Sequence, residues 1–558
     1  MQPTAEQQQA IALFRTGGSL KINAFAGSGK TTTLALLSET TARPGIYLAF
    51  NRAIANEAAA KFPRTVECRT THSLAFRATP SEFKQTTGKM RDRLFGNAIA
   101  QILELRDLVL SRDFSLARRS FGALIGETVR RFQHSDARTI EARHVPRWGK
   151  MAALPRPALT RLLKETVERA RRLWAKMIDP SDPTPLGHDG YLKLWSLGRP
   201  QIPADFVLLD EAQDSNPTVL TVLEEQSSQL VYVGDRYQQI YEWRGAVNAM
   251  DLIETQHVSS LTQSFRFGSA IAEAATRVLR ALGETQVIEG NEKIASRLSP
   301  VDPDAILCRT NANVIDEVMR ALEEREEPPC VVGGTSDALR LLEGVSRLKR
   351  GQPTDVPEFF GFSSWSEVVA FSESDEGEPL RTFVRLVERH GDVALRACMK
   401  AVVEDERAAS VVISTVHKAK GREWEQVRLT DDFTLKRKDQ NGKEALDEAE
   451  ARLFYVALTR AKLAIEVPPK LAGVFGIVQP PLVADRTTTE PQPRPPLPTR
   501  PVVAKPIAAP RPHAAAPAVG APHTQPEKLG SPTRAGGSSD RRTEPDKRRS
   551  LLGWLRGH

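Results

Sequence analysis

The residues most able to do chemistry lie in a glycine-rich segment, Asn23 to Thr32, which reads NAFAGSGKTT. Backbone N–H groups of such a turn cradle phosphates, a lysine at position 30 sits beside the β- and γ-phosphates, and the Thr31 hydroxyl can bind Mg²⁺. Ala24 stands where the general pattern has Gly. The nucleotide contacts predicted from this loop are Ala24, Phe25, Ala26, Gly27, Ser28, Gly29, Lys30, Thr31 and Thr32.

A second chemical segment, Leu208 to Asp214, reads LLDEAQD and follows an apolar run. If that run is a strand, Asp210 emerges at the carboxyl edge of a sheet, where it and Thr31 are the predicted metal ligands. Glu211 can orient and deprotonate an attacking water. A solvated acidic turn has the same residues, but pairing with a phosphate loop favours phosphoryl transfer.

These residues must be positioned by a sheet, and short apolar runs alternate with helical patterns in the way typical of parallel α/β architecture. Strands are predicted at Leu20–Ala24, Ile46–Phe50, Phe206–Leu209, Leu230–Val233, Ala305–Cys308, Val411–Thr415 and Gln426–Leu429. Between residues 80 and 200 the pattern is helical and rich in Arg and Leu, as in 122–133 and 159–178. We therefore predict two α/β domains, the first with a helical insertion and the second with a mixed insertion.

The carboxyl-terminal part differs from the rest in composition. Residues 480–558 hold 16 of the 38 prolines, and Arg486 to His558 hold 13 basic and 5 acidic residues. This tail carries the whole net charge of +8, since 64 residues of each sign remain elsewhere. Such a segment cannot bury enough apolar surface to fold, so we predict disorder. Leu551 to Leu555 either dock on a protein partner or are apolar by chance.

No run of 18 apolar residues occurs, and the start of the chain lacks the basic and apolar regions of a signal peptide. We expect no membrane contact and a cytoplasmic location, at the nucleoid if the source is bacterial. The four cysteines have no Cys-x-x-Cys spacing, so neither disulfides nor a zinc site are predicted.

Several longer strings resemble the motifs of superfamily 1 DNA helicases of the UvrD/Rep type. The acidic segment Asp210 to Asp214 is followed by Val233 to Ala246, VGDRYQQIYEWRGA, and these look like the second and third motifs. Further matches fall in the family's order from residue 3 to about 466: Gln7, Phe50-Asn51, Thr71-His72, Gln263 to Arg266, Thr415 to Trp424 and Tyr455 to Ala461.

Three segments are similar to the helicase part of F-box DNA helicases and their bacterial relatives: Tyr47 to Ala55, His188 to Trp195 and Val332 to Gly334. No F-box-like segment precedes Gln7, so a ubiquitin-ligase role is not expected. The resemblance implies two RecA-like P-loop domains. The expected boundaries are 1–79 and 186–266 for the first RecA-like domain, 80–185 for its helical insertion, 267–326 and 406–478 for the second RecA-like domain, 327–405 for its short mixed insertion, and 479–558 for the disordered tail.

The resemblance implies ATP and Mg²⁺ as cofactors. It assigns catalysis to Lys30, Asp210, Glu211, Gln238, Arg266 and Arg460. Arg266 and Arg460 match arginines that stabilise the γ-phosphate from opposite walls of the interdomain cleft, and an arginine finger is worth about 10³ to 10⁵ in rate. Gln7 matches the adenine-reading residue, Gln238 the γ-phosphate sensor, and Glu423 a residue near the ribose.

Single-stranded nucleic acid is usually held by bases stacked on aromatic side chains and by contacts to the backbone. The DNA contacts implied by the resemblance are Phe50, Asn51, His72, Trp243, Arg244 and His417. The expected partners are single-stranded DNA and duplex DNA with a single-stranded tail. RNA stays open as a substrate, since stacking does not distinguish the sugars.

The sequence departs from the family pattern at three places. Thr32 stands where an Arg commonly stacks on adenine, the second insertion is short, and no strand-separating hairpin follows the sixth motif. The Lys-rich segment Leu435 to Lys443, with Asn441-Gly442 as a turn signal, is a candidate replacement. The leading hypothesis is an ATP-dependent 3′–5′ DNA helicase acting in repair or recombination. The alternatives are a translocase that strips proteins with little unwinding, and a non-hydrolysing, ATP-gated binding module.

Overall fold

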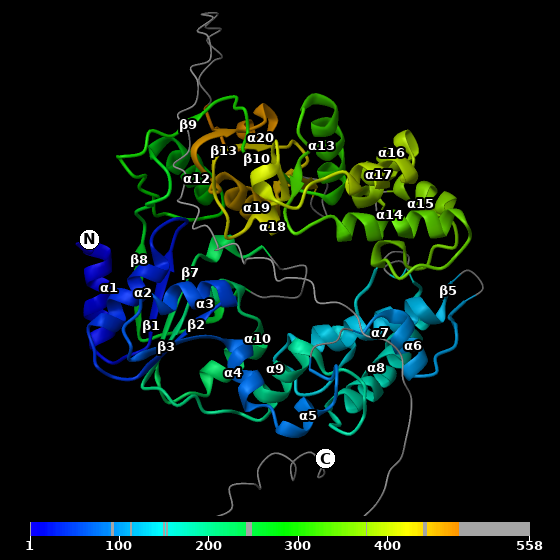
Figure 1. Cartoon of the computed structure of the whole chain (residues 1–558), viewed down its shortest axis with the longest axis horizontal. Coiled ribbons are helices and arrows are strands. Elements are labelled where there is room, and N and C mark those ends of the chain that lie inside the picture. The colour runs from blue at the N-terminus through cyan, green and yellow to red at the C-terminus, as the bar shows by residue number, and fades with distance from the viewer. Residues whose placement is uncertain are drawn as a thin grey trace, which may run out of the picture. The chain divides into compact units, whose positions relative to one another are not determined.

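The computed structural model describes most of the chain up to residue 478. The described ranges are 2–90, 94–111, 114–148, 151, 154–240, 248–374, 377–438 and 444–478. The predicted tail, with Leu551 to Leu555, and the predicted DNA contacts Trp243 and Arg244 lie outside these ranges. We call residues 2–266 the first half and residues 267–478 the second half; each contains one large sheet (Figure 1).

The first half contains a six-stranded sheet in the order β3-β2-β6-β7-β1-β8, and all its strand pairs are parallel. Its strands are β1 (Leu20–Ala24), β2 (Gly45–Ala49), β3 (Val66–Thr70), β6 (Phe206–Leu209), β7 (Gln229–Gly234) and β8 (His257–Leu261). Parallel strands end at a common edge. The phosphate loop after β1 and the acidic segment after β6 therefore lie at the same edge, separated by β7.

The second half repeats this plan. Its six-stranded sheet has the order β11-β12-β10-β13-β16-β9, again with parallel pairs throughout. The strands are β9 (Arg297–Leu298), β10 (Ala305–Cys308), β11 (Cys330–Val331), β12 (Val412–Thr415), β13 (Trp424–Leu429) and β16 (Ala461–Glu466). The predicted α/β class with two parallel sheets is thus confirmed.

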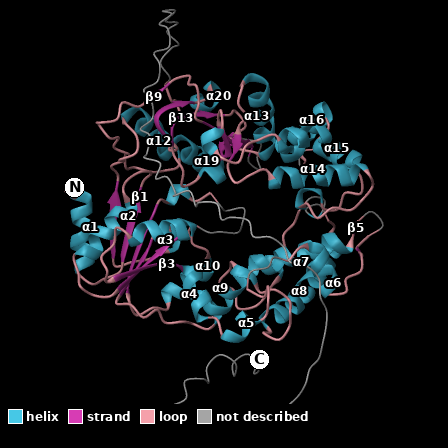
Figure 2. Ribbon diagram, viewed as in Figure 1, coloured by secondary structure: helices cyan, strands magenta, loops and turns pink. Residues whose placement is uncertain are grey.

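Helices cover the sheets on both sides, as Figure 2 shows. Those of the first half are α1 (Ala5–Arg15), α2 (Lys30–Glu39), α3 (Arg52–Ala59), α4 (Thr71–Ala78), α10 (Pro217–Glu224) and α11 (Ala249–Leu252). Those of the second half are α12 (Ser269–Ala281), α13 (Asn311–Glu324), α18 (Val416–Ala419), α19 (Glu448–Leu458) and α20 (Pro469–Val474). No helix within the described ranges combines the length and apolar composition needed to cross a bilayer.

A helical block separates β3 from β6 in sequence. It comprises α5 (Ser81–Gln85), α6 (Gly96–Ile102), α7 (Arg118–Gln133), α8 (Arg156–Ile178) and α9 (Gly187–Leu197), with a short antiparallel pair of β4 (Leu108–Val109) and β5 (Ser115–Leu116). Helices α6 and α7 can approach closely because Gly122 has no side chain. A Cβ at Gly122 would lie 2.1 Å from the carbonyl oxygen of Gly96. Helices 122–133 and 159–178, predicted from periodicity, are parts of α7 and α8.

The second insertion is mainly helical, although the sequence predicts a mixed segment. It contains α14 (Ser336–Lys349), α15 (Trp365–Ser372), α16 (Glu378–His390) and α17 (Asp392–Lys400). The range 327–405 also includes β11, which pairs with β12 and so belongs to the second sheet. A short strand of two residues carries too little pattern to be assigned from sequence.

The two insertions touch each other. Arg119 Nη2 on α7 lies 3.1 Å from Asp355 Oδ2, and the Ser120 hydroxyl donates to the Thr354 carbonyl oxygen at 2.7 Å. Phe360 packs edge-on against Trp148 with ring centroids 5.4 Å apart. Phe360 is buried within the apolar cluster of the first half's helical block. The halves therefore meet at the insertions as well as at the sheets.

The helical block is fastened by a buried ammonium group. Lys89 is fully buried, and its Nζ donates to four backbone carbonyl oxygens, those of Lys176, Asp179, Asp182 and Thr184, at 3.2, 2.7, 2.7 and 2.8 Å. Burial lowers the pKa of Lys89. A positive charge at the carboxyl end of a helix satisfies carbonyls that have no partner in the helix.

We predict that Lys89→Met destabilises this region by about 3 kcal/mol, because buried carbonyl groups are left without donors. The measurement is amide hydrogen exchange of residues 176–184, together with thermal unfolding. Lys164→Met, at an exposed position of α8, is the matched control and should leave both unchanged. Equal protection of residues 176–184 in wild type and Lys89→Met contradicts this role.

Candidate functional site

The predicted phosphate loop lies between the carboxyl end of β1 and the first residue of α2. Gly27 and Gly29 have φ angles of 74° and 76°, which disfavour residues with a side chain. A Cβ on Gly27 would lie 2.5 Å from Ser264 Oγ. Gly29 caps α2 without a side-chain hydrogen bond, so the helix presents its first N–H groups to the loop. This cradle fits a phosphate group.

Oxygen donors suited to Mg²⁺ meet beside the loop. The Thr31 hydroxyl donates to Asp210 Oδ2 at 2.6 Å, and the Tyr47 hydroxyl donates to the same oxygen at 2.8 Å. Burial and the neighbouring Glu211 raise the pKa of Asp210. Mg²⁺ usually binds through one or two carboxylates, with substrate phosphates and water completing its shell. Thr31 and Asp210 are donors of that kind.

Glu211 adopts a left-handed backbone conformation with φ 50° and ψ 43°. A non-glycine residue in this region is strained by about 1–3 kcal/mol, and such strain concentrates at functional sites. Its Oε1 lies 3.6 Å from Lys30 Nζ, and Gln213 Nε2 donates to Oε2 at 2.6 Å. Burial raises the pKa of Glu211, but the charges of Lys30 and Lys420 outweigh burial and bring it to about 2. The carboxylate is ionised at neutral pH.

Gln238 lies at the end of a short helix after β7 and links the two halves. Its Nε2 donates to Asp235 Oδ2 at 2.8 Å, and Arg460 Nη2 lies 3.5 Å from its Oε1. Arg460 is fully buried. Burial and the charge of Arg266 lower the pKa of Arg460 to about 9, which leaves the guanidinium charged at neutral pH.

Arg266, the last residue of the first half, forms an ion pair with Glu423 of the second half. Arg266 Nε donates to Glu423 Oε2 at 2.7 Å, and its Nη1 donates to the Thr459 carbonyl oxygen at 3.0 Å. Lys462 Nζ also lies 2.7 Å from Glu423 Oε1. Both predicted arginines therefore contact Thr459: Arg266 donates to its carbonyl oxygen, and Arg460 Nη2 donates to its hydroxyl oxygen at 3.2 Å.

A buried ion pair also joins the two halves. Lys420 Nζ lies 2.6 Å from Asp214 Oδ2 and donates to the backbone carbonyl oxygen of Gln238. Burial raises the pKa of Asp214 to about 6, although Lys420 opposes the shift. Neither residue is among the predicted site residues.

Gln7 and Phe265 lie beside the loop at Gly29. Gln7 is buried, donates to Thr33 Oγ1 at 3.1 Å and accepts from the Thr4 N–H in a capping box at the start of α1. The Phe265 ring lies 3.4 Å from the position of a Cβ on Gly29, and 39% of Phe265 is exposed. It offers a flat apolar face for a base. Phe265 directly precedes Arg266, but sequence reasoning did not assign it.

The predicted nucleic-acid contacts follow strand ends. Phe50 follows β2 and is 58% exposed, whereas Asn51 Oδ1 accepts from the Ile54 N–H and so caps α3. His72 Nε2, on α4 after β3, lies 3.5 Å from Asp189 Oδ1. His417 lies on α18, directly after β12 of the second sheet. The structure thus places three of these residues along the carboxyl edge of the first sheet and one at that of the second.

Five polar residues of the site were missed from sequence: Tyr47, Asp214, Asp235, Lys420 and Tyr455. Asp235 follows β7 as Asp210 follows β6, so the same reasoning about strand ends could have found it. Lys420 and Tyr455 lie in the motif-like strings Thr415 to Trp424 and Tyr455 to Ala461, but the sequence assigned them no role. Tyr455 contacts Asp235 across 220 positions of sequence, and Lys420 contacts Asp214 across 206.

Comparison with known families identifies two segments of the chain. The UvrD/REP helicase N-terminal domain model matches residues 193–257, and the UvrD-like helicase C-terminal domain model matches residues 364–467. A solved structure of PRRSV helicase is also similar, at 11% identity over 83% of this chain and 53% of that one, with a TM-score of 0.27. At that TM-score the likeness carries no further argument.

Two curated relatives align with most of this chain. F-box DNA helicase 1 of Gallus gallus is 31% identical over 515 residues, which are 85% of this chain and 50% of the relative. F-box DNA helicase protein 1 of Schizosaccharomyces pombe is 30% identical over 525 residues, 85% of this chain and 58% of the relative. The chain spans between half and three fifths of their length. It therefore contains segments that match the N- and C-terminal domain models of UvrD-like helicases, and it is homologous to the F-box DNA helicases at about 30% identity over most of its length.

Proposed function

We propose that this protein is an ATP-dependent helicase that moves 3′ to 5′ on single-stranded DNA and couples ATP hydrolysis to strand separation in repair or recombination. The observation that carries the proposal is one connected set of polar side chains drawn from both halves. Lys30 faces Glu211 in the first half, and Gln238 of that half meets Arg460 of the second half. The direction of movement rests on the family resemblance.

The residues present fit ATP and Mg²⁺. The N–H groups of Gly27 to Lys30 would hold the phosphates, Thr31 and Asp210 would hold the metal, and Phe265 with Gln7 would face the base. When bound, the nucleotide supplies the phosphoanhydride bond whose hydrolysis releases free energy. Because Glu211 is ionised, it can accept a proton from a water molecule, and the ammonium of Lys30 balances negative charge in the loop.

The two arginines give the hydrolysis site a dependence on the second half. Arg460 reaches Gln238 from beyond α19, and Arg266 is bonded to Glu423 and Thr459 of the second half. Guanidinium groups that stabilise transferred phosphate are worth about 10³ to 10⁵ in rate. If both must be in place, hydrolysis requires the halves to be closed, and opening after hydrolysis moves their nucleic-acid contacts apart.

The nucleic-acid contacts proposed here are Phe50, Asn51, His72, Trp243, Arg244 and His417. The exposed ring of Phe50 supports stacking, which contributes about 1–3 kcal/mol per base. Burial raises the pKa of Asp189, but hydrogen bonds from His134 and His72 outweigh it and hold the pKa well below its usual range. The resulting carboxylate fixes the position of the His72 ring beside α9.

A second candidate function is a translocase that strips proteins from DNA and unwinds poorly. After Arg460 the described chain continues only through β16 and α20, without a further hairpin.

A short antiparallel hairpin, β14 (Lys436–Lys438) with β15 (Glu444–Leu446), precedes α19 instead, and its predicted turn at Asn441-Gly442 lies outside the described residues. We propose this hairpin as the strand-separating element. Asp447 at its base caps α19 and so anchors the hairpin to the second half.

Duplexes with a single 3′ or 5′ tail, made of DNA and of RNA, test the proposed function. We expect ATP-dependent unwinding of the DNA duplex with the 3′ tail, and hydrolysis stimulated by single-stranded DNA. Unwinding from 5′ tails alone contradicts the assigned direction. Stimulated hydrolysis without unwinding favours the stripping translocase, and DNA binding without any hydrolysis favours an ATP-gated binding module.

Lys30→Ala should abolish ATP hydrolysis and leave weak DNA binding, because the loop loses the charge that balances the phosphates while the predicted DNA contacts remain. Phosphate release and fluorescence anisotropy of labelled single-stranded DNA measure the two properties. Lys61→Ala, at an exposed lysine of the first half, is the control. Hydrolysis that persists in Lys30→Ala would refute the role given to Lys30.

The buried Asp214 predicts a pH dependence. Its pKa of about 6 in the folded state exceeds the unfolded value of about 3.9, so the folded state binds the additional proton as pH falls from 6 to 4. Protonation favours folding in this window but removes the charge that pairs with Lys420. We expect DNA-stimulated hydrolysis to fall below about pH 6 in wild type.

Asp214→Asn should give a lower rate that stays flat through the same pH window, since its side chain no longer titrates. Asp302→Asn, at an exposed carboxylate, should keep the wild-type profile. Steady-state hydrolysis between pH 5 and 8 makes the comparison. An unchanged acidic limb in Asp214→Asn contradicts the assignment of that limb to Asp214.

A further inference from the structure

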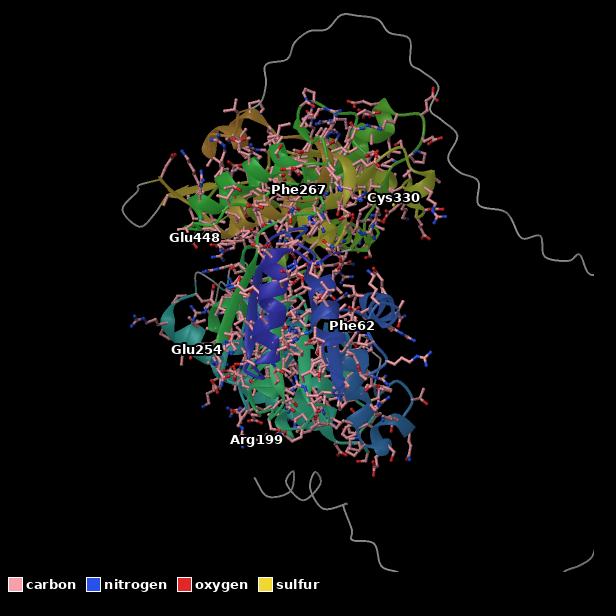
Figure 3. The ribbon with its side chains drawn as sticks, turned by 90° about the vertical axis from the view of Figure 1, so that its left-hand side faces the viewer. Phe62, Arg199, Glu254, Phe267, Cys330 and Glu448 are labelled. Atoms are coloured by element: carbon pink, nitrogen blue, oxygen red, sulfur yellow. The ribbon has the colours of Figure 1, made fainter. Side chains whose placement is uncertain are left out.

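Tyr455 is a fully buried residue of α19, and its hydroxyl forms hydrogen bonds with the other half of the molecule. Both hydrogen-bond partners of this hydroxyl belong to the first half: the Ala26 N–H donates to it at 3.1 Å, and it donates to Asp235 Oδ2 at 2.9 Å. The ring packs edge-on against Tyr237, with centroids 6.4 Å apart. In Figure 3, Glu448, the first residue of α19, lies among the elements of the second half, above those that carry Phe62 and Glu254.

The first of these bonds reaches the phosphate loop itself. The loop is also anchored by the Phe25 N–H, which donates to the Leu261 carbonyl oxygen at 3.0 Å, and by the Gly27 carbonyl oxygen, which accepts from the Phe265 N–H at 2.8 Å. Those two anchors come from β8 and the segment directly after it. The bond at Ala26 comes from the second half, so the loop's backbone is held partly by a helix of the second half.

The second bond reaches the residues that face Arg460. Asp235 Oδ2 also accepts from Gln238 Nε2, and Gln238 Oε1 lies near Arg460 Nη2. Tyr455 and Arg460 are five residues apart on one continuous segment. Burial, with the neighbouring Asp235 carboxyl, raises the pKa of Tyr455 well above its ordinary value, so the phenol keeps its proton and acts as the donor to Asp235.

We propose that Tyr455 is a positioning residue that makes closure of the two halves depend on the conformation of the phosphate loop. Its hydroxyl joins a loop N–H to the Asp235–Gln238 pair. Closing the halves completes both bonds at once, and opening them leaves the Ala26 N–H and Asp235 each short of one partner. The inference rests on the proposed ATP hydrolysis and adds to it the residue through which the second half acts on the loop.

A purely structural tyrosine would behave differently. A hydroxyl that only stabilised its own fold would bond within α19 or the second sheet, and its removal would lower stability without separating nucleotide binding from turnover. Because both partners of Tyr455 lie in the first half, the expected loss falls on the step that needs the halves closed. Nucleotide binding should be preserved, since the anchors of Phe25 and Gly27 remain.

The test is Tyr455→Phe in the full chain, which keeps the ring and removes the hydroxyl. We expect kcat for hydrolysis stimulated by single-stranded DNA to fall about ten- to a hundredfold, the range of one charge-assisted hydrogen bond. The KM for ATP and the affinity for a fluorescent ATP analogue should stay within about twofold, since a loss confined to kcat marks an interaction made only on the way to reaction. Thermal unfolding checks that the variant is folded.

Two further variants separate coupling from packing. Tyr237→Phe keeps the other ring of the pair and removes a hydroxyl directed to Glu284 of the second half. This contact between the halves does not reach the phosphate loop, so the variant should keep wild-type kcat. Asp235→Asn retains the side-chain shape and weakens the acceptor, so it should reproduce the loss. If the two residues act through one bond, Tyr455→Phe combined with Asp235→Asn should lose less than the product of the single losses.

The outcomes distinguish this inference from the proposed function. A wild-type protein without DNA-stimulated hydrolysis overturns the proposed function. Stimulated hydrolysis in wild type that Tyr455→Phe retains in full overturns the inference alone. An equal loss in Tyr237→Phe, or a rise in KM that matches the fall in kcat, also overturns it, because either result assigns Tyr455 to packing or to nucleotide binding.

Discussion

Buried carboxyl groups crowd one edge of the first sheet, and most of the site follows from the need to compensate them. Asp210, Glu211 and Asp214 follow β6, and Asp235 follows the neighbouring strand β7. Like charges at such an edge disfavour ionisation unless cations or hydrogen-bond donors are close. The first half supplies Lys30 and Thr31, but Asp214 and Asp235 are satisfied from the second half, by Lys420 and Tyr455. The acidic edge is therefore complete only when the halves are together.

This arrangement links the candidate site to the relative position of the two halves without a large moving domain. Both sheets are parallel, so each presents all its strand ends along one edge, and the polar contacts that join the halves at the candidate site gather there. The segment that leads from β8 to the second half passes the phosphate loop, where Ser264 and Arg266 leave no room for a side chain at Gly27. The covalent connection between the halves thus runs through the site.

Much of the architecture could be predicted because local sequence patterns indicate it. Strands β1, β6 and β10 have the predicted boundaries. Strands β6 and β10 are continuous apolar runs, which mark strands buried on both faces, whereas β1 alternates buried with partly buried residues. The edge strand β3 carries Glu67 and Arg69 on partly exposed positions and gave no such signal. The phosphate loop and Asp210 were also predicted from short, local sequence patterns. The bond from Tyr455 to Ala26 spans 429 positions, and no pattern within either segment indicates it. Long-range polar contacts depend on the fold that brings them together.

The contact between the insertions has a mechanical consequence. The halves meet at the polar edge of the sheets and again, away from it, where Phe360 enters the apolar cluster beside Trp148. Two separate points of attachment define a line. A relative movement that keeps both attachments is a rotation about that line, and sliding of one half along the other must break at least one of them. If opening breaks the bonds at the polar edge, as proposed for Tyr455, the contact of Trp148 with Phe360 is the attachment about which the halves can still turn.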